Sequence, residues 1–366
     1  MTPSRAVVFS GVNRIDEPPS VVPRLPAFGL MLAGLTVAVV VLALVSVSIG
    51  SVPISLADVW RIVAGHLGLG SAAAGDPVAD QIVWTVRLPR TLLAILVGAG
   101  LGVAGTVIQA VVRNPLGDPQ LIGVTPGAGF GAVLVIVLGS DAVGGVPLAA
   151  AAFGGALLAF AIVFLLGHRG GEWPPARLVL AGVAVGYVFS SATYFLQILA
   201  TPTQVQRVLY WSLGSVSGAR WADLPLLTAV VVLGAGWLVI AGGRLNALVS
   251  GADLARSLGV DVGRFQLQLM LLAALVTGCV VTVSGGIGFV GLMVPHIARQ
   301  LVGADHRRVL PCALLIGAAV LLVADLIARL VLAPAELPVG VVTAAIGAPF
   351  FVWLLASGRR AVRTTR

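Results

Sequence analysis

The sequence contains no lysine, and it has few charges of either sign. Only 10% of its 366 residues are charged, whereas 58% are hydrophobic and occur in long runs. The phosphate-cradling loop of many ATP-hydrolysing proteins ends in Gly-Lys-Ser or Gly-Lys-Thr, so this chain cannot carry it. The two cysteines fall inside apolar runs, and the four histidines are dispersed without metal-ligand spacing. We therefore expect no catalytic residue, no metal site and no cofactor bound by this chain.

Ten apolar segments have lengths that suit membrane spans. A helix needs about 20 apolar residues to cross roughly 30 Å of hydrocarbon, and in lipid its backbone groups must be satisfied internally. The sequence therefore predicts an all-α integral membrane protein with about ten transmembrane helices. The expected spans are residues 27–49, 92–112, 121–138, 146–167, 178–199, 224–241, 267–283, 287–302, 310–332 and 339–356.

All basic side chains are arginines, and their distribution sets the orientation of these spans. With the N-terminus inside, sixteen of the 22 arginines fall on the cytosolic side and six fall outside. The positive-inside rule then places both termini in the cytosol. The formal charge of +8 follows from this topology. We therefore expect a multi-pass protein of the cell (inner) membrane with no nucleic-acid partner.

The sequence divides into one membrane domain and two short tails. Residues 1–26 are polar, with several prolines near their end, and are expected to be a disordered cytosolic tail. The apolar stretch that follows is too long for the core of a signal peptide, so we interpret it as a retained first span. A single ten-helix domain is expected over residues 27–358, followed by a basic cytosolic tail over residues 359–366.

A polar stretch, RLNALVSGADLARSLGVDVGR, separates two long apolar segments. Ser250 and Asp253 have the spacing of a capping box, and Gly259 suits the position just after a helix end. Leu254 and Leu258 lie four apart, so they would share one face of a helix about two turns long. Such a helix is not stable alone in water. It is either an ordinary loop helix or a small cytosolic knob for a soluble partner.

Two further polar features lie at opposite ends of the predicted spans. Residues 113–119 read RNPLGDP; the prolines stop helices, and Asn114 and Asp118 can bond freed backbone groups. This segment is either a simple cytosolic turn or part of a gate. On the outside, Arg87 and Arg90 open the second span, where two guanidiniums suit the carboxylates of an acidic partner. Snorkelling arginines at a helix end are the plainer alternative.

Three charged residues near the external end of the ninth span suggest a rival mechanism. Asp325 and Arg329 are four apart, and Glu336 follows in the outer loop. A proton-coupled transporter could use them as a relay. An unpaired charge at the bilayer centre costs roughly 3 kcal/mol, and an i,i+4 pair near the interface is cheaper, so we favour structural pairing. A membrane scaffold or receptor that transports nothing is a second alternative.

Glycines recur at helical spacing within two spans. Gly98 and Gly102 form one small-xxx-small pair, and Gly127 and Gly131 form another. Such faces let helix backbones approach closely in a medium that gives no hydrophobic drive to association. We interpret both pairs as packing contacts within one subunit, in preference to a seam between two subunits.

From about residue 87 to residue 355, the chain resembles the permease subunits of the FecCD/BtuC-like type II ABC importers. The resemblance rests on an ordered series of segments: RLPRTLLAILVGAGLGVAGTVIQAVVRNPLGDPQLIGV, RLVLAGVAVG, YWSLGSVSGARW, GADLARSLGV, GFVGLMVPHIARQLVGADHR, ADLIARL and ELPVGVVTAAIGAPFF. It implies the BtuC-like permease fold and a non-catalytic transport subunit. The implied substrate is most commonly an iron(III)-siderophore, with cobalamin or haem as alternatives.

The resemblance also implies partners. They are a second permease subunit in a homo- or heterodimer, two ATP-binding subunits that use ATP and Mg²⁺, and an extracytoplasmic substrate-binding protein, besides the lipid bilayer. The ATPase would dock on a coupling helix over residues 251–259. The residues expected there are Gly251, Asp253, Leu254, Ala255, Arg256, Leu258 and Gly259.

Two further groups of site residues follow from the same resemblance. Carboxylates of the binding protein are expected to meet Arg87, Arg90 and Arg329. The gate or pathway residues would be Asn114, Pro115, Pro174 and Pro175. Some relatives have small hydroxyl residues where this chain has its two adjacent prolines, so the resemblance does not imply the gate chemistry at that position.

Overall fold

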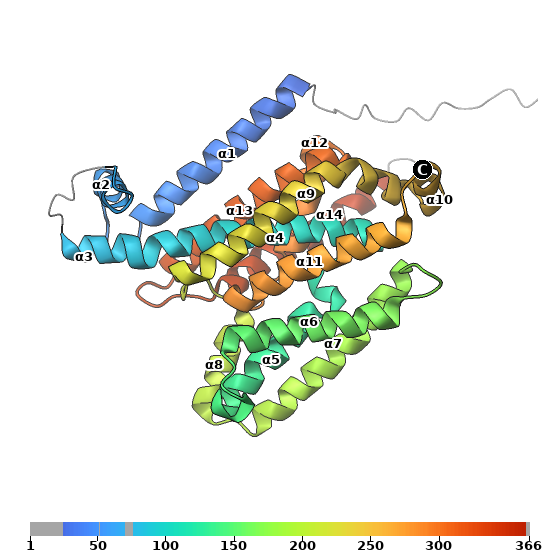
Figure 1. Cartoon of the computed structure of the whole chain (residues 1–366). Helices are drawn as coiled ribbons and strands as arrows, with labels where there is room; N and C mark the ends of the chain where they lie inside the picture. Colours follow the sequence, from blue (N-terminus) through green and yellow to red (C-terminus); the bar gives the residue numbers. More distant parts are fainter. Residues whose placement is uncertain (1–24, 51, 70–75, 364–366) are drawn as a thin grey trace, which may run out of the picture.

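The computed structural model describes residues 25–50, 52–69 and 76–363 (Figure 1). The predicted tail over residues 1–26 lies almost wholly outside the described residues. The described elements are helical, apart from one isolated bridge between Arg169 and Glu172. The long helices are α1 (Leu25–Ser48), α4 (Leu88–Val112), α5 (Val124–Leu138), α6 (Leu148–Gly167), α7 (Pro175–Ile198), α9 (Leu224–Ser250), α11 (Val262–Ser284), α12 (Val290–Val302), α13 (His306–Leu330) and α14 (Val339–Arg363).

Each of the ten predicted spans falls on one of these long helices. Seven helical runs of the described chain are long and apolar enough to cross a membrane, and α5 and the apolar part of α14 are shorter. The prediction of an all-α integral membrane protein is therefore confirmed. The end of α14 differs from the prediction, because the helix continues to Arg363 and includes most of the expected basic tail. The connecting elements are α2 (Leu56–His66), α3 (Pro77–Asp80), the π-helical η1 (Gln81–Arg87), η2 (Pro119–Ile122), η3 (Asp141–Val143), α8 (Pro202–Leu213), η4 (Trp221–Asp223) and α10 (Ala252–Ser257).

Helix α4 lies at the centre of the bundle, surrounded by α9, α11, α12 and α13 (Figure 1). Most of its residues are buried. Its glycines make this possible: a Cβ on Gly98 would overlap the carbonyl oxygen of Gly317 in α13, and one on Gly105 would overlap that of Gly291 in α12. Close backbone approach of this kind holds helices together where lipid surrounds them. The pair of Gly98 and Gly102 therefore packs within the chain, as predicted.

Helices α5, α6 and α7 form a second group beside the central bundle (Figure 1). Here Gly127 and Gly131 of α5 face α6, where an added Cβ would overlap the carbonyl oxygens of Gly155 and Ala151. The second predicted glycine pair is thus also a contact within one chain. The loop between α6 and α7 touches the central bundle again, where the Trp173 N–H bonds to Gln266 of α11.

The connecting segments gather at two ends of the molecule. At one end, Arg113 after α4 donates a hydrogen bond to the carbonyl oxygen of Leu248 at 3.1 Å, and Asn246 donates to Asp305 before α13 at 2.7 Å. Helix α10 and the α6–α7 loop lie at this same end. At the other end are α2, the start of α4 and the end of α13. The segments assigned to the cytosol from the arginine distribution are thus on one side.

Candidate functional site

The predicted cytosolic helix is present as α10 (Ala252–Ser257), between α9 and α11. At its C-terminal end, the Gly259 N–H bonds to the carbonyl oxygen of Arg256, and the Val260 N–H bonds to that of Ala255, both at 2.9 Å. This pair of bonds is the Schellman arrangement, and it needs a left-handed residue after the helix. The φ of Gly259 is +79°. The predicted role of Gly259 as the helix stop is therefore confirmed.

The predicted capping box of Ser250 and Asp253 is wrong. Helix α9 continues to Ser250, past the span end predicted at residue 241. Ser250 thus has helical backbone, and its hydroxyl donates to the carbonyl oxygen of Asn246 at 3.0 Å. Gly251 takes the N-cap position with a φ of +137° and no side-chain cap. The change of direction from α9 to α10 therefore depends on a backbone conformation that glycine adopts readily, and not on a side-chain cap.

The surface of α10 divides into a buried side and an exposed side. Ala255 is fully buried against the membrane domain, whereas Leu254 and Leu258 are 49% and 64% exposed. Arg256 and Asp253 form an exposed ion pair at 2.7 Å. The helix therefore presents two leucines and a charged pair from a base that is fixed to the bundle. An exposed apolar pair rimmed by charges suits a protein partner.

The two segments predicted to form a cytosolic gate line one open cavity at the surface, with a volume of about 580 Å³. Asn114 comes from the turn after α4, and Pro175 is the first residue of α7. The Asn114 side chain accepts a hydrogen bond from the Leu116 N–H at 2.9 Å, which holds the turn. Pro115 is exposed in that turn, and Pro174 is the N-cap residue of α7. The remaining lining residues are Val112, Ala176, Val179, Leu180 and Val183.

Asp118 is a buried carboxyl group in the same turn. One of its oxygens accepts the Gln120 N–H at 2.7 Å and so begins η2. Burial raises the pKa of Asp118 to about 6, and the hydrogen bond from Gln120 opposes this rise. The turn therefore contains a group whose charge changes close to neutral pH.

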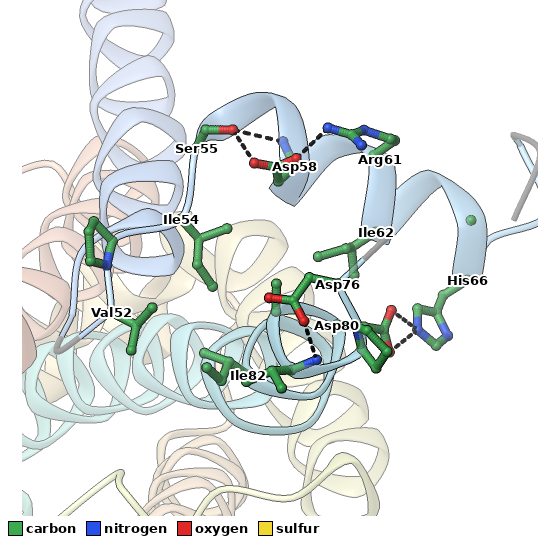
Figure 2. Close-up of a pocket in the computed structure, with 15 residues that line it drawn as sticks. Val52, Ile54, Ser55, Asp58, Arg61, Ile62, His66, Asp76, Asp80 and Ile82 are labelled. Atoms are coloured by element: carbon green, nitrogen blue, oxygen red, sulfur yellow. Dashed lines mark hydrogen bonds and ion pairs between the residues drawn. The ribbon is translucent and has the colours of Figure 1, made fainter. Parts of the chain in front are cut away.

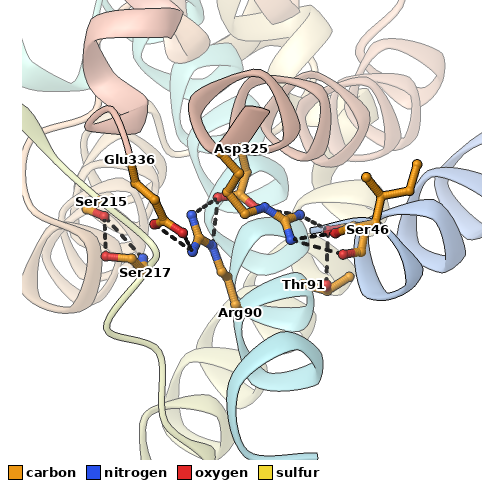
Figure 3. A network of polar contacts seen from close by, with 9 residues as sticks. Ser46, Arg90, Thr91, Ser215, Ser217, Asp325 and Glu336 are labelled. Carbon is orange, nitrogen blue, oxygen red and sulfur yellow. Dashed lines mark hydrogen bonds and ion pairs between the residues drawn. The ribbon is translucent and has the colours of Figure 1, made fainter. Parts of the chain in front are cut away.

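At the opposite end of the bundle, an ion-pair network joins α1, α4, α13 and the loop before α14 (Figure 3). Arg90 donates through Nε to Asp325 at 2.9 Å and through one terminal nitrogen to both Glu336 oxygens, at 3.0 and 2.8 Å. Arg329 lies 3.0 Å from the other Asp325 oxygen and donates to the Ser46 carbonyl at 3.0 Å. Asp325 has no exposed surface. A carboxylate so buried requires such partners, which fits structural pairing.

Arg87 and Arg90, the two arginines expected to meet an acidic partner, are both buried in this chain. Their exposed fractions are only 6% and 4%. Arg87 donates to the carbonyl oxygens of Val47 and Ser48, both at 2.9 Å. The reason is that the helical run begins earlier than predicted, at Pro77. Both arginines therefore lie inside a long helical run rather than at its start.

Two polar residues outside the predicted sites hold the α6–α7 loop in place. Glu172, in this loop, pairs with Arg256 of α10. Gln266 of α11 is 5% exposed and accepts the Trp173 N–H at 3.3 Å. An amide in an apolar span was a usable signal for Gln266, because buried polar side chains need partners. Glu172 gave no such signal, since its partner is 84 positions away.

A separate pocket of about 630 Å³ lies at the external end, between α2 and the α3–η1 run (Figure 2). Its apolar wall includes Ile54 and Ile82, and Ser55 caps the first turn of α2. His66 hydrogen bonds to Asp80 at 3.0 Å. Asp58 and Arg61, at the rim of the pocket, form an ion pair. Four of the ionisable side chains around the pocket thus pair with one another, and the fifth, Asp76, accepts the Val78 N–H.

The family model and the most similar relatives that we compared indicate the same protein family. Residues 38–357 match the model of the FecCD transport family. The cobalamin import system permease protein BtuC of Halobacterium salinarum is 44% identical over 277 residues, which cover 76% of this chain and 74% of the relative. The hemin transport system permease protein HmuU of Yersinia pestis is 39% identical over 337 residues. These residues cover 90% of this chain and 96% of the relative.

A solved structure agrees with this grouping. A protein described as a metal-chelate type ABC transporter in an inward-facing conformation matches with a TM-score of 0.78 and 34% identity. The match covers 90% of this chain and 99% of that chain. The helical bundle, the cytosolic knob and these matches define a permease subunit of a type II ABC importer, which is a multi-pass membrane protein. The chain belongs to the FecCD transport family.

Replacing Asp118 by Asn should stabilise the protein at pH 8 and leave it unchanged near pH 4. Folding raises the pKa of Asp118 from 3.8 to about 6, so the folded turn binds the proton more tightly than the unfolded chain. The wild-type free energy of unfolding therefore rises as the pH falls through about 6 and levels off below about 4. The full difference corresponds to about 3 kcal/mol, so we expect a gain of about 1–3 kcal/mol at pH 8.

Thermal unfolding of the detergent-solubilised protein between pH 4 and pH 8 measures this effect. Asp76→Asn is the matched control, because Asp76 is an exposed N-cap aspartate whose side chain accepts the Val78 N–H at 3.0 Å. A gain for Asp118→Asn that is independent of pH would contradict the burial argument.

Proposed function

We propose that this chain forms half of the translocation path of an ATP-driven importer, and that ATP and Mg²⁺ act in separate subunits docked on α10. The observation that carries this proposal is the exposure of Leu254 and Leu258 on a helix whose Ala255 is fully buried. A helix of this length has no stability of its own, so its folded shape depends on the membrane domain. A partner that binds α10 is therefore linked mechanically to the bundle.

A second permease subunit, identical or related, completes the path in this proposal. One chain provides a cavity at the cytosolic end, lined by Asn114 and Pro175. We assign this cavity to one side of the gate. Alternation between outward- and inward-facing states then requires only that nucleotide-bound ATPase subunits bind one permease state more tightly than the other.

The cargo in this proposal is a bulky metal chelate. Ferric siderophore is the substrate expected from the resemblance of the sequence, and the named relatives add support for cobalamin and haem. The solved neighbour, described as a metal-chelate type transporter, fits all three. In this proposal the substrate-binding protein selects the chelate, because the permease contributes the translocation path and the contacts with its partner proteins.

The substrate-binding protein docks, in this proposal, over the external network. Arg90 is the centre of that network, but its guanidinium is occupied by two carboxylates of its own chain. Asp325 is fully buried, whereas the side chain of Glu336 is 41% exposed. An incoming carboxylate would therefore compete with Glu336 for Arg90, and Arg329 would remain on Asp325.

The rival mechanism of a proton relay uses the same residues. Asp325 lies between two guanidiniums, and Glu336 gives both of its oxygens to Arg90. Both carboxylates are therefore engaged in contacts that hold α4, α13 and the loop before α14 together, which supports a structural role. Uptake that persists without the ATPase subunits and collapses with the proton gradient would favour the relay.

Cells that lack this protein should lose ATP-dependent uptake of one chelate when ferric siderophores, haem and cobalamin are tested side by side. Loss of one activity, restored by the intact gene, identifies the cargo. Persistence of all three in cells without a redundant importer would overturn the substrate proposal and favour a scaffold that transports nothing.

Replacing Leu258 by Asp should lower the amount of ATPase subunit retained by the purified permease by about tenfold or more. A carboxylate buried at an apolar contact without a partner costs well over the roughly 1.4 kcal/mol that a tenfold change requires. Leu116→Asp is the control, because Leu116 is a half-exposed leucine elsewhere at the cytosolic end. Normal retention in the Leu258 variant would remove α10 from the ATPase contact.

Replacing Glu336 by Gln should tighten binding of the substrate-binding protein about two- to fivefold in a direct affinity measurement. The substitution weakens an internal competitor for Arg90, and a partly exposed ion pair contributes up to about 1 kcal/mol. Asp223→Asn is the control, because it frees the exposed Arg220 from a comparable pair at 3.0 Å. If only the control tightens binding, Arg220 and not Arg90 is the docking arginine.

A further inference from the structure

The loop between α6 and α7, residues 168–174, is attached to the α10–α11 connection at successive points. The Glu172 carboxylate pairs with Arg256 of α10. The carbonyl oxygen of Gly171 lies so close to Gly263 of α11 that a Cβ there would overlap it. One turn further along α11, Gln266 accepts a hydrogen bond from the backbone of the loop. A hairpin-like bridge within the loop, formed by reciprocal bonds of Arg169 and Glu172 at 2.9 and 3.2 Å, holds its shape.

The attachment points differ in strength. The pair of Glu172 and Arg256 is partly exposed on both sides, at 35% and 48% of the side-chain surface, so alone it contributes little. The hydrogen bond from Trp173 to Gln266 is buried, and its loss would leave a backbone N–H without a partner. The Trp173 ring stacks on Phe164 at 4.5 Å, which anchors the loop to α6 as well.

The chain between this loop and the gate cavity is stiff. Trp173 is followed directly by Pro174 and Pro175. Each proline fixes its own φ, and each restricts the residue before it to extended conformations. Pro175 begins α7 and lines the gate cavity. A displacement of the loop is therefore passed to the cavity wall instead of being absorbed in the connection.

We propose that Glu172, Gly263 and Gln266 are positioning residues that make the α6–α7 loop move together with α10 and α11. Movement imposed on α10 by the ATPase then reaches the gate cavity through Pro174 and Pro175. The inference rests on the proposed function, because it requires an ATPase subunit on α10. It adds the route by which that contact acts on α7, and this route lies within one chain.

The test uses the complete complex of permease, ATPase subunits and binding protein in liposomes. The double variant Glu172→Gln with Gln266→Leu should lower the number of chelate molecules imported per ATP hydrolysed at least about fivefold. Retention of the ATPase subunits and their rate of ATP hydrolysis should stay near wild type. Glu172→Gln alone changes only a partly exposed side chain, so it keeps the test valid if the double variant folds poorly; it should show a smaller fall in the same ratio.

A second readout separates positioning from general stability. Ala176→Cys places a thiol in the gate cavity, and its labelling by a membrane-impermeant maleimide should change when ATP binds. That change should disappear in the double variant and persist in two controls. Gln268→Leu alters an exposed amide on the same helix, and Arg264→Gln removes an exposed ion pair with Asp261 at 3.3 Å.

The outcomes are distinguishable. An unchanged import ratio and an unchanged labelling response in the double variant would overturn the inference, as would an equal loss in the controls. If the wild-type permease does not retain ATPase subunits through α10, the proposed function fails and the inference fails with it. The route through the loop is supported if the double variant imports fewer chelate molecules per ATP and loses the labelling response while it retains the ATPase subunits normally.

Discussion

The constraint on which the structure depends is that helices in lipid gain nothing from hiding apolar side chains from one another. Cohesion must come from close backbone packing and from a few buried polar contacts. In this protein the packing is supplied by glycines around α4 and between α5 and α6. The polar contacts lie at the two ends, where Arg90 and Arg329 hold Asp325 and where Asn246 joins α9 to Asp305. Close backbone packing therefore stabilises the middle of the bundle, and polar contacts and ion pairs stabilise its two ends.

This division explains how the two ends can have separate tasks. The external network joins α1, α4 and α13 to the loop before α14, and Arg90 and Arg329 are paired with carboxylates of the same chain. The cytosolic end brings together four connecting segments that are far apart in the sequence. Helices α4 and α13 run between the two ends and contact each other where Gly98 faces Gly317. These two helices form the common support for both sites.

The amino-acid sequence was sufficient for the fold class, because long apolar runs and the arginine distribution are strong and local signals. It also predicted α10 and its end at Gly259, since a left-handed glycine has a recognisable position. The start of α10 was predicted wrongly, because Ser250 fits a capping box equally well whether or not α9 continues through it.

Contacts between distant residues were beyond the sequence. The burial of Arg87 and Arg90 was not predicted, because the sequence placed them at the start of a span, whereas the helical run already begins at Pro77. Glu172 has no local pattern that points to Arg256, and the pairing exists only because the folded chain brings the α6–α7 loop against α10. The cavity shared by Asn114 and Pro175 is of the same kind, since its walls come from two separate segments.

The two adjacent prolines before α7 also affect the thermodynamics of the loop that they end. A proline in a compatible conformation removes freedom from the unfolded chain, and one such residue is worth about 0.4–1 kcal/mol. Pro174 has a φ of −59°, close to the value that its ring imposes, so the position is occupied without strain. Ordering this segment therefore costs less conformational entropy than ordering a flexible loop of equal length. Less of the free energy gained from the contacts of this loop with α6, α10 and α11 is therefore offset by lost conformational freedom.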